Sequence, residues 1–118
     1  MIEKEFMDYE LALELKQLGF VEPCLASYYH AGRRLHICEY INHGEYTVLA
    51  PTYSQAFRWF RKEYALESYI RANLFVDVPK TYQFNIDDNI DDVWYDTYEE
   101  AELACLKKLI EIVKGGNK

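Results

Sequence analysis

Two clusters of side chains in this sequence are of types that bind metal ions. Residues 87–92 (DDNIDD) gather the carboxylates that calcium prefers, but they lack the glycine and the terminal glutamate of an EF-hand loop. Cys24, His30, His36 and Cys38 fall on one expected hairpin, where the two histidines would point to opposite faces. We therefore expect a solvated acidic turn and separate histidines, with no metal ion and no cofactor.

A third cluster, residues 58–62 (RWFRK), is the densest basic and aromatic segment of the chain. Stacking by Trp59 and cations on phosphates would suit a nucleic-acid contact. No broader basic surface accompanies it, however, because the formal net charge is −7. We favour an amphipathic helix with Phe60 inward. Trp59 lies at the border of the two helix faces and is the first candidate anchor for a protein partner.

The residues of nucleophilic catalysis form no known pattern here. No serine or cysteine stands in a nucleophile elbow, and the five glycines include no phosphate-binding loop. We therefore expect a protein that is not an enzyme. A small-ligand binder or enzyme remains the alternative, with a pocket lined by some of the eleven tyrosines.

Composition limits the setting of these residues. The chain has 118 residues, half of them apolar, which is enough for one domain with a core. Its acidity argues against general binding to nucleic acid or anionic membranes. Three cysteines without CxxC spacing favour reduced thiols. With neither a signal peptide nor an apolar run of about 18 residues, we expect a cytoplasmic protein.

A short repeat organises the chain. Residues 50–56 (APTYSQA) are echoed 45 positions later by residues 95–101 (YDTYEEA). Each copy follows a strand-like run and opens an amphipathic helix. Thr52 and Thr97 are expected N-caps, with Gln55 and Glu100 at the capping-box position. The sequence therefore predicts a single domain, 1–118, containing an internal repeat, 24–64 and 69–113.

The hydrophobic pattern predicts an α+β fold. A first helix, 8–18, has Asp8 as N-cap and Gly19 as a left-handed terminal residue. Strands are expected at 24–30, 35–41, 46–50, 68–76, 80–86 and 93–95, and helices at 53–64 and 98–113. The expected arrangement is an N-terminal helix followed by two ββ(β)α repeats. These would form one mainly antiparallel sheet with helices on one face and a pseudo-twofold relation.

The two helical segments also carry a resemblance. Residues 49–64 and 95–110, together with residues 15–20 and the following Glu22-Pro23-Cys24, resemble a family of small uncharacterised proteins. These proteins are encoded by phages, prophages and mobile elements of gut Bacteroidales. Residues 66–92 match least. The resemblance implies a mobile-element setting but carries no activity, cofactor or functional residue.

Together these features predict a non-enzymatic accessory protein that binds a protein partner, with a homodimer as a further option. The candidate contacts are Tyr29, Tyr40, Arg58, Trp59, Arg61, Lys62, Asp87, Asp88, Asp91 and Asp92. One variant of this hypothesis is an acidic decoy that occupies a nucleic-acid-binding surface. The alternative is a nucleic-acid module that uses Arg33, Arg34, Arg58, Arg61 and Lys62.

Overall fold

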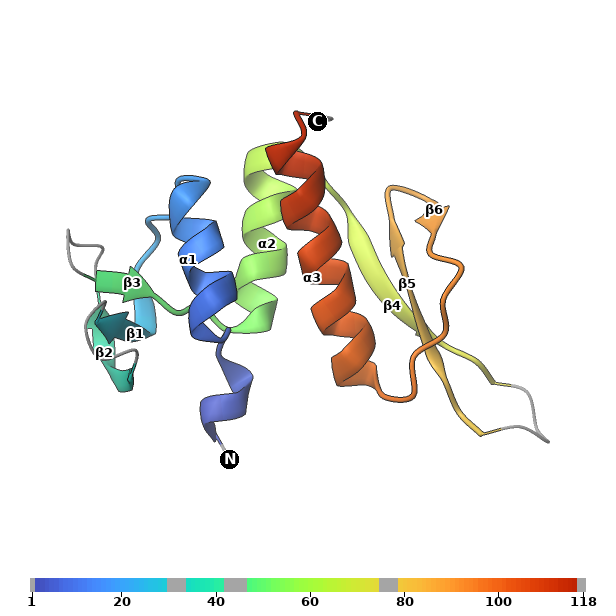
Figure 1. Cartoon of the computed structure of the whole chain (residues 1–118), viewed down its shortest axis with the longest axis horizontal. Coiled ribbons are helices and arrows are strands. Elements are labelled where there is room, and N and C mark those ends of the chain that lie inside the picture. Colours follow the sequence, from blue (N-terminus) through green and yellow to red (C-terminus); the bar gives the residue numbers. More distant parts are fainter. Residues whose placement is uncertain (1, 30–33, 42–46, 75–78, 117–118) are drawn as a thin grey trace. The chain divides into compact units, whose positions relative to one another are not determined.

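The computed structural model of the chain describes residues 2–29, 34–41, 47–74 and 79–116 (Figure 1). The fold is α+β, as predicted, and it divides into two compact units, Met1–Ala56 and Phe57–Lys118. The boundary between the units falls inside helix α2 (Tyr53–Tyr64). Within the described residues, no helix is both long enough and apolar enough to cross a membrane.

The first unit combines helices with a three-stranded antiparallel sheet. A 3-10 helix (Ile2–Glu5) precedes α1 (Tyr9–Gln17), and the strands are β1 (Cys24–Tyr29), β2 (Leu35–Ile41) and β3 (Thr47–Leu49). β1 is the central strand, in the order β2-β1-β3. α1 lies beside β3 (Figure 1). The buried core of this unit includes Met7, Leu11, Leu15, Phe20 and Val48.

Both ends of α1 form as the sequence predicts. The Asp8 carboxylate accepts a hydrogen bond from the Leu11 N–H at 3.0 Å. Gly19 adopts a φ of +100°, which glycine tolerates because it has no Cβ. The Phe20 N–H then donates to the Leu15 carbonyl at 3.0 Å, as in a Schellman motif. These contacts satisfy terminal backbone groups that a helix leaves open.

The second unit packs a long helix on another three-stranded antiparallel sheet. After the rest of α2 come β4 (Ser68–Ala72), β5 (Tyr82–Ile86), β6 (Asn89–Ile90) and α3 (Tyr98–Lys114). The strand order is β4-β5-β6, and α3 packs against β4 and β5 (Figure 1). The buried face of α3 consists of Ala101, Cys105, Leu106, Leu109 and Ile110.

The sheet topology differs from the expected single sheet. The described strands form two separate sheets, because the third strand of each unit pairs within its own unit: β3 with β1, and β6 with β5. The expected strand at 93–95 is reduced to one bridge between Tyr82 and Tyr95. β6 lies instead inside the expected acidic loop. Asp87 and Asp88 have positive φ values of 50° and 66°, which suit a two-residue type I′ hairpin turn.

The helix starts of the two repeat copies are capped unequally. At α3, Thr97 and Glu100 make both hydrogen bonds of the predicted capping box. At α2, the Thr52 hydroxyl accepts from the Gln55 N–H at 3.1 Å, but the Gln55 side chain donates to the Pro23 carbonyl. The repeat thus preserves the N-cap in both copies and the full box in the second.

Candidate functional site

Trp59, the predicted partner anchor, is buried. Only 4% of its surface is exposed, and its ring meets Phe60 and Tyr64 edge-on, with centroids 5.1 and 5.4 Å apart. Such aromatic contacts stabilise a core. The expectation that Trp59 offers an exposed ring to a partner therefore does not hold in the described structure.

The other predicted contacts on α2 are accessible. Arg58, Arg61 and Lys62 are exposed, and Lys62 lies 3.9 Å from Glu63 in an exposed ion pair. The side chains of Tyr29 and Tyr40, like residue Arg33, lie outside the described part of the structure. The basic face of α2 therefore exists as a solvated helix face, and its role stays a prediction.

The acidic residues of 87–92 divide into solvated and structural groups. Asp88 and Asp92 are exposed. Asp87 is exposed too, but its Oδ1 accepts the Glu67 N–H at 2.9 Å and so ties the start of β4 to the turn. Asp91 is half-buried and accepts the Tyr95 hydroxyl at 3.1 Å. Among the described residues, no three His, Cys, Asp or Glu side chains are placed to hold a metal ion.

One face of the β4-β5-β6 sheet is distinct from the face that packs on α3. Tyr69 and Arg71 of β4 pair with Asn85 and Gln83 of β5. Directly opposed residues in antiparallel strands point to the same side. We call this side the outer face, and it comprises Tyr69, Arg71, Gln83, Asn85 and Trp94. Trp94 belongs to it because the Arg71 guanidinium carbon lies 5.6 Å from its ring centroid.

The outer face combines two exposed aromatic side chains with two buried amide side chains. Tyr69 and Trp94 are 52% and 41% exposed, whereas Gln83 and Asn85 are 5% and 3% exposed. The Gln83 amide nitrogen donates to the Asp91 carbonyl. The amide oxygens Gln83 Oε1 and Asn85 Oδ1 have no hydrogen-bond partner among the described residues. A buried unpaired acceptor costs about 1–3 kcal/mol, so two on one face are unusual.

A cavity of about 380 Å³ opens at one end of this face. It is lined by Glu67, Tyr69, Asn85, Asp87 and Asp88. The lining thus combines three carboxylates, one exposed aromatic ring and one buried, unpaired amide oxygen, with no basic side chain. All of these groups favour a positively charged ligand that donates hydrogen bonds.

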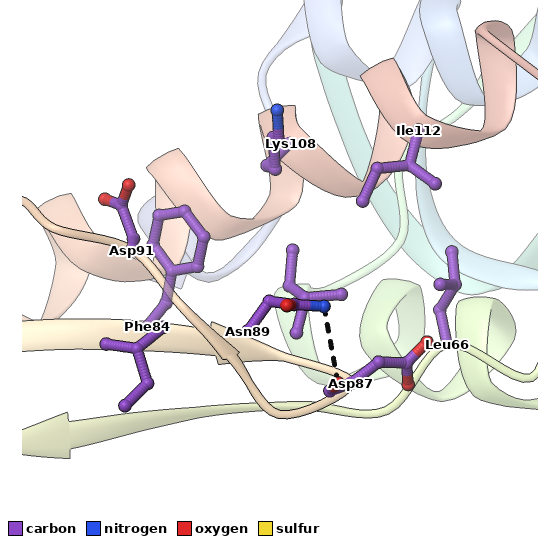
Figure 2. Close-up of a pocket in the computed structure, with 9 residues that line it drawn as sticks. Leu66, Phe84, Asp87, Asn89, Asp91, Lys108 and Ile112 are labelled. Atoms are coloured by element: carbon purple, nitrogen blue, oxygen red, sulfur yellow. Dashed lines mark hydrogen bonds between the residues drawn. The ribbon is translucent and has the colours of Figure 1, made fainter. Parts of the chain in front are cut away.

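A second cavity, also about 380 Å³, lies on the α3 side of the sheet (Figure 2). Its apolar walls are formed by Leu66, Phe84, Ile86, Ile90 and Ile112. Its polar groups are Asp87, Asn89, Asp91 and Lys108. The Asn89 amide donates to the Asp87 carbonyl at 3.4 Å, and Lys108 pairs with Glu111 at 3.1 Å. Its described lining contains no tyrosine, unlike the expected tyrosine-lined pocket.

Two cysteines are too deeply buried to act as nucleophiles at neutral pH. Burial raises the pKa of Cys24 to about 12, and burial likewise raises the pKa of Cys105 to about 12. Both therefore remain thiols near pH 7, and the thiolate is the reactive form. They belong to the packing of their units.

No family model, curated protein or solved structure matches the chain. The outer face is therefore identified as a candidate site from its geometry alone. Sequence reasoning located Asp87 and Asp88 but missed Tyr69, Gln83 and Asn85. The available signal was the alternation of Gln83 and Asn85 with apolar neighbours along β5, which marks a polar strand face without showing that it is buried.

Proposed function

We propose that the chain is a non-enzymatic accessory protein of a phage or mobile element, and that it binds a protein partner through the outer face. The proposal is carried by one observation: the outer face combines exposed Tyr69 and Trp94 with the buried, unpaired oxygens of Gln83 and Asn85. The mobile-element setting is supported by the resemblance of the two helical segments.

A protein partner bound to the outer face would bury both of its exposed aromatic rings. Tyrosine and tryptophan are enriched at protein interfaces because each buries a large apolar surface and carries a polar tip. Hydrogen-bond donors from a partner would also pair the amide oxygens, whose burial without partners is costly. The neighbouring carboxylates of Asp87 and Asp88 would steer a basic partner towards the face.

The test is capture of a partner by matched variants of the tagged full-length chain. Tyr69→Ala combined with Trp94→Ala removes both exposed rings of the outer face. Tyr98→Ala removes a ring of similar exposure, 44%, outside that face. We expect one protein to be enriched by the wild type and by Tyr98→Ala, and reduced about tenfold or more by the double variant. Equal enrichment by all three proteins would contradict the proposal.

A further inference from the structure

We propose that the cavity lined by Glu67, Tyr69, Asn85, Asp87 and Asp88 receives an arginine side chain of the partner. This inference rests on the proposed function, since it names the group by which the partner is recognised. It identifies the partner as a protein with an accessible basic segment.

The polar groups of the cavity can all accept hydrogen bonds, and its charged groups are all negative. Glu67, Asp87 and Asp88 contribute carboxylates, and Asn85 contributes an amide oxygen that is unpaired within the described structure. A guanidinium group offers five N–H donors, has no acceptor and stays charged. It therefore matches both the charge of the cavity and its excess of acceptors.

The aromatic wall supports the same assignment. Tyr69 is 52% exposed and lines the cavity next to Asn85. Arginine stacks on aromatic rings because the positive guanidinium is attracted to the negative face of the ring. The outer face already contains one such pair, in which Arg71 lies over Trp94. An arginine of the partner stacked on Tyr69 would form a second such pair on this face, because Tyr69 lies two residues before Arg71 on β4.

The geometry favours arginine over lysine and over a metal ion. The acceptors come from Glu67 directly before β4, from Asn85 of β5 and from the turn that follows β5, so one ligand must direct donors to several places at once. A planar guanidinium does this, whereas a lysine ammonium is a compact point charge. The carboxylates of the described residues are not grouped closely enough for a metal ion. A volume of about 380 Å³ leaves room for the apolar stem of the side chain.

The experiment is an NMR titration of the ¹⁵N-labelled full chain with three capped pentapeptides. The probes are acetyl-Gly-Gly-Arg-Gly-Gly-amide and its lysine and citrulline counterparts. We expect the arginine peptide to shift the Asn85 side-chain amide signal in a saturable manner. The lysine peptide should bind about threefold or more weakly, and the uncharged citrulline peptide about tenfold or more weakly. Equal shifts by all three peptides would overturn the inference.

Two pairs of variants make the test specific. Asp88→Asn removes a charge from the cavity while keeping a residue type that tolerates positive φ. Asp92→Asn removes a charge from an exposed neighbour outside the lining. We expect Asp88→Asn to weaken arginine-peptide binding about threefold and Asp92→Asn to leave it nearly unchanged. Tyr69→Ala should also weaken binding, whereas Tyr98→Ala should not. Equal weakening by Asp88→Asn and Asp92→Asn would mean general attraction to negative charge and would overturn the inference.

The outcomes separate this inference from the proposed function. Partner capture that depends on Tyr69 and Trp94, without any shift of the Asn85 signal by the arginine peptide, overturns the arginine site and leaves protein binding intact. Arginine-specific binding in the cavity, with partner capture insensitive to the double variant, supports a guanidinium site there but overturns both the outer face as the partner surface and the assignment of the arginine to that partner. None of these variants changes a buried residue, so each is expected to fold.

Discussion

The turn between β5 and β6 contains two of the three non-glycine residues with positive φ in the described part of the chain. Asp87 and Asp88 both adopt positive φ, where the Cβ of an L-residue crowds the backbone. Asp87 also accepts a hydrogen bond from the Glu67 N–H. Backbone strain of this kind persists where surrounding contacts impose it. Here the hydrogen bond from the Glu67 N–H fixes the Asp87 carboxylate at the cavity.

Asp88 offers a direct test of this conformation. We expect Asp88→Val to lower the free energy of unfolding by about 1–2 kcal/mol relative to Asp88→Gly, because a β-branched side chain is poorly accommodated at a φ of 66°. Urea unfolding of both variants measures the difference. Asp92→Val and Asp92→Gly are the matched controls, because Asp92 is exposed and does not have positive φ. An equal difference at both positions would contradict the role assigned to the turn.

At the scale of elements, the capping box of α3 is the clearest local determinant of structure. Thr97 Oγ1 accepts the Glu100 N–H at 3.1 Å, and Glu100 accepts the Thr97 N–H at 3.1 Å. We expect Thr97→Ala to lower the free energy of unfolding by about 1 kcal/mol, measured by urea unfolding, because an N-terminal donor of the helix loses its partner. Glu99→Ala, in the same turn but outside the box, should cost about 0.5 kcal/mol or less. A loss no larger than that for Thr97→Ala would contradict the prediction.

Capping also explains why the helices could be predicted and the sheets could not. Asp8, Gly19 and Thr97 act on residues three or four positions away, so the sequence alone locates them. Strand pairing joins distant residues, and the pattern does not say whether a third strand returns to its own hairpin. Trp59 was misassigned for a related reason. A position at the border of two helix faces can be covered or open depending on what packs beside it.

The outer face, too, could be predicted only in part from the sequence. The charges of Asp87 and Asp88 placed both residues at the surface. Gln83 and Asn85 occupy alternate positions of β5, which predicts a solvated polar face. Their burial becomes apparent only once Tyr69 and Arg71 stand opposite them across the strand pair.

At the scale of the whole molecule, the chain carries a buried thiol in each compact unit. Cys24 belongs to Met1–Ala56 and Cys105 to Phe57–Lys118. Burial raises the pKa of both thiols from 9.0 to about 12. Because the neutral thiol is favoured in the folded state, their contribution to stability is constant below pH 9. It is lost as pH rises from 9 towards 12. At pH 8 each thiol is therefore a neutral, protected reporter of the opening of its own unit.

These reporters test whether the chain behaves as the single domain that its sequence predicts. With Cys38→Ser, a further Cys105→Ala leaves Cys24 alone, and Cys24→Ala leaves Cys105 alone. We expect both thiols to react with an alkylating reagent at pH 8 only through opening, and to give the same opening free energy at each urea concentration. The boundary between the units falls inside α2, so one helix contributes residues to both units. Different opening free energies for Cys24 and Cys105 would instead establish two independently unfolding units.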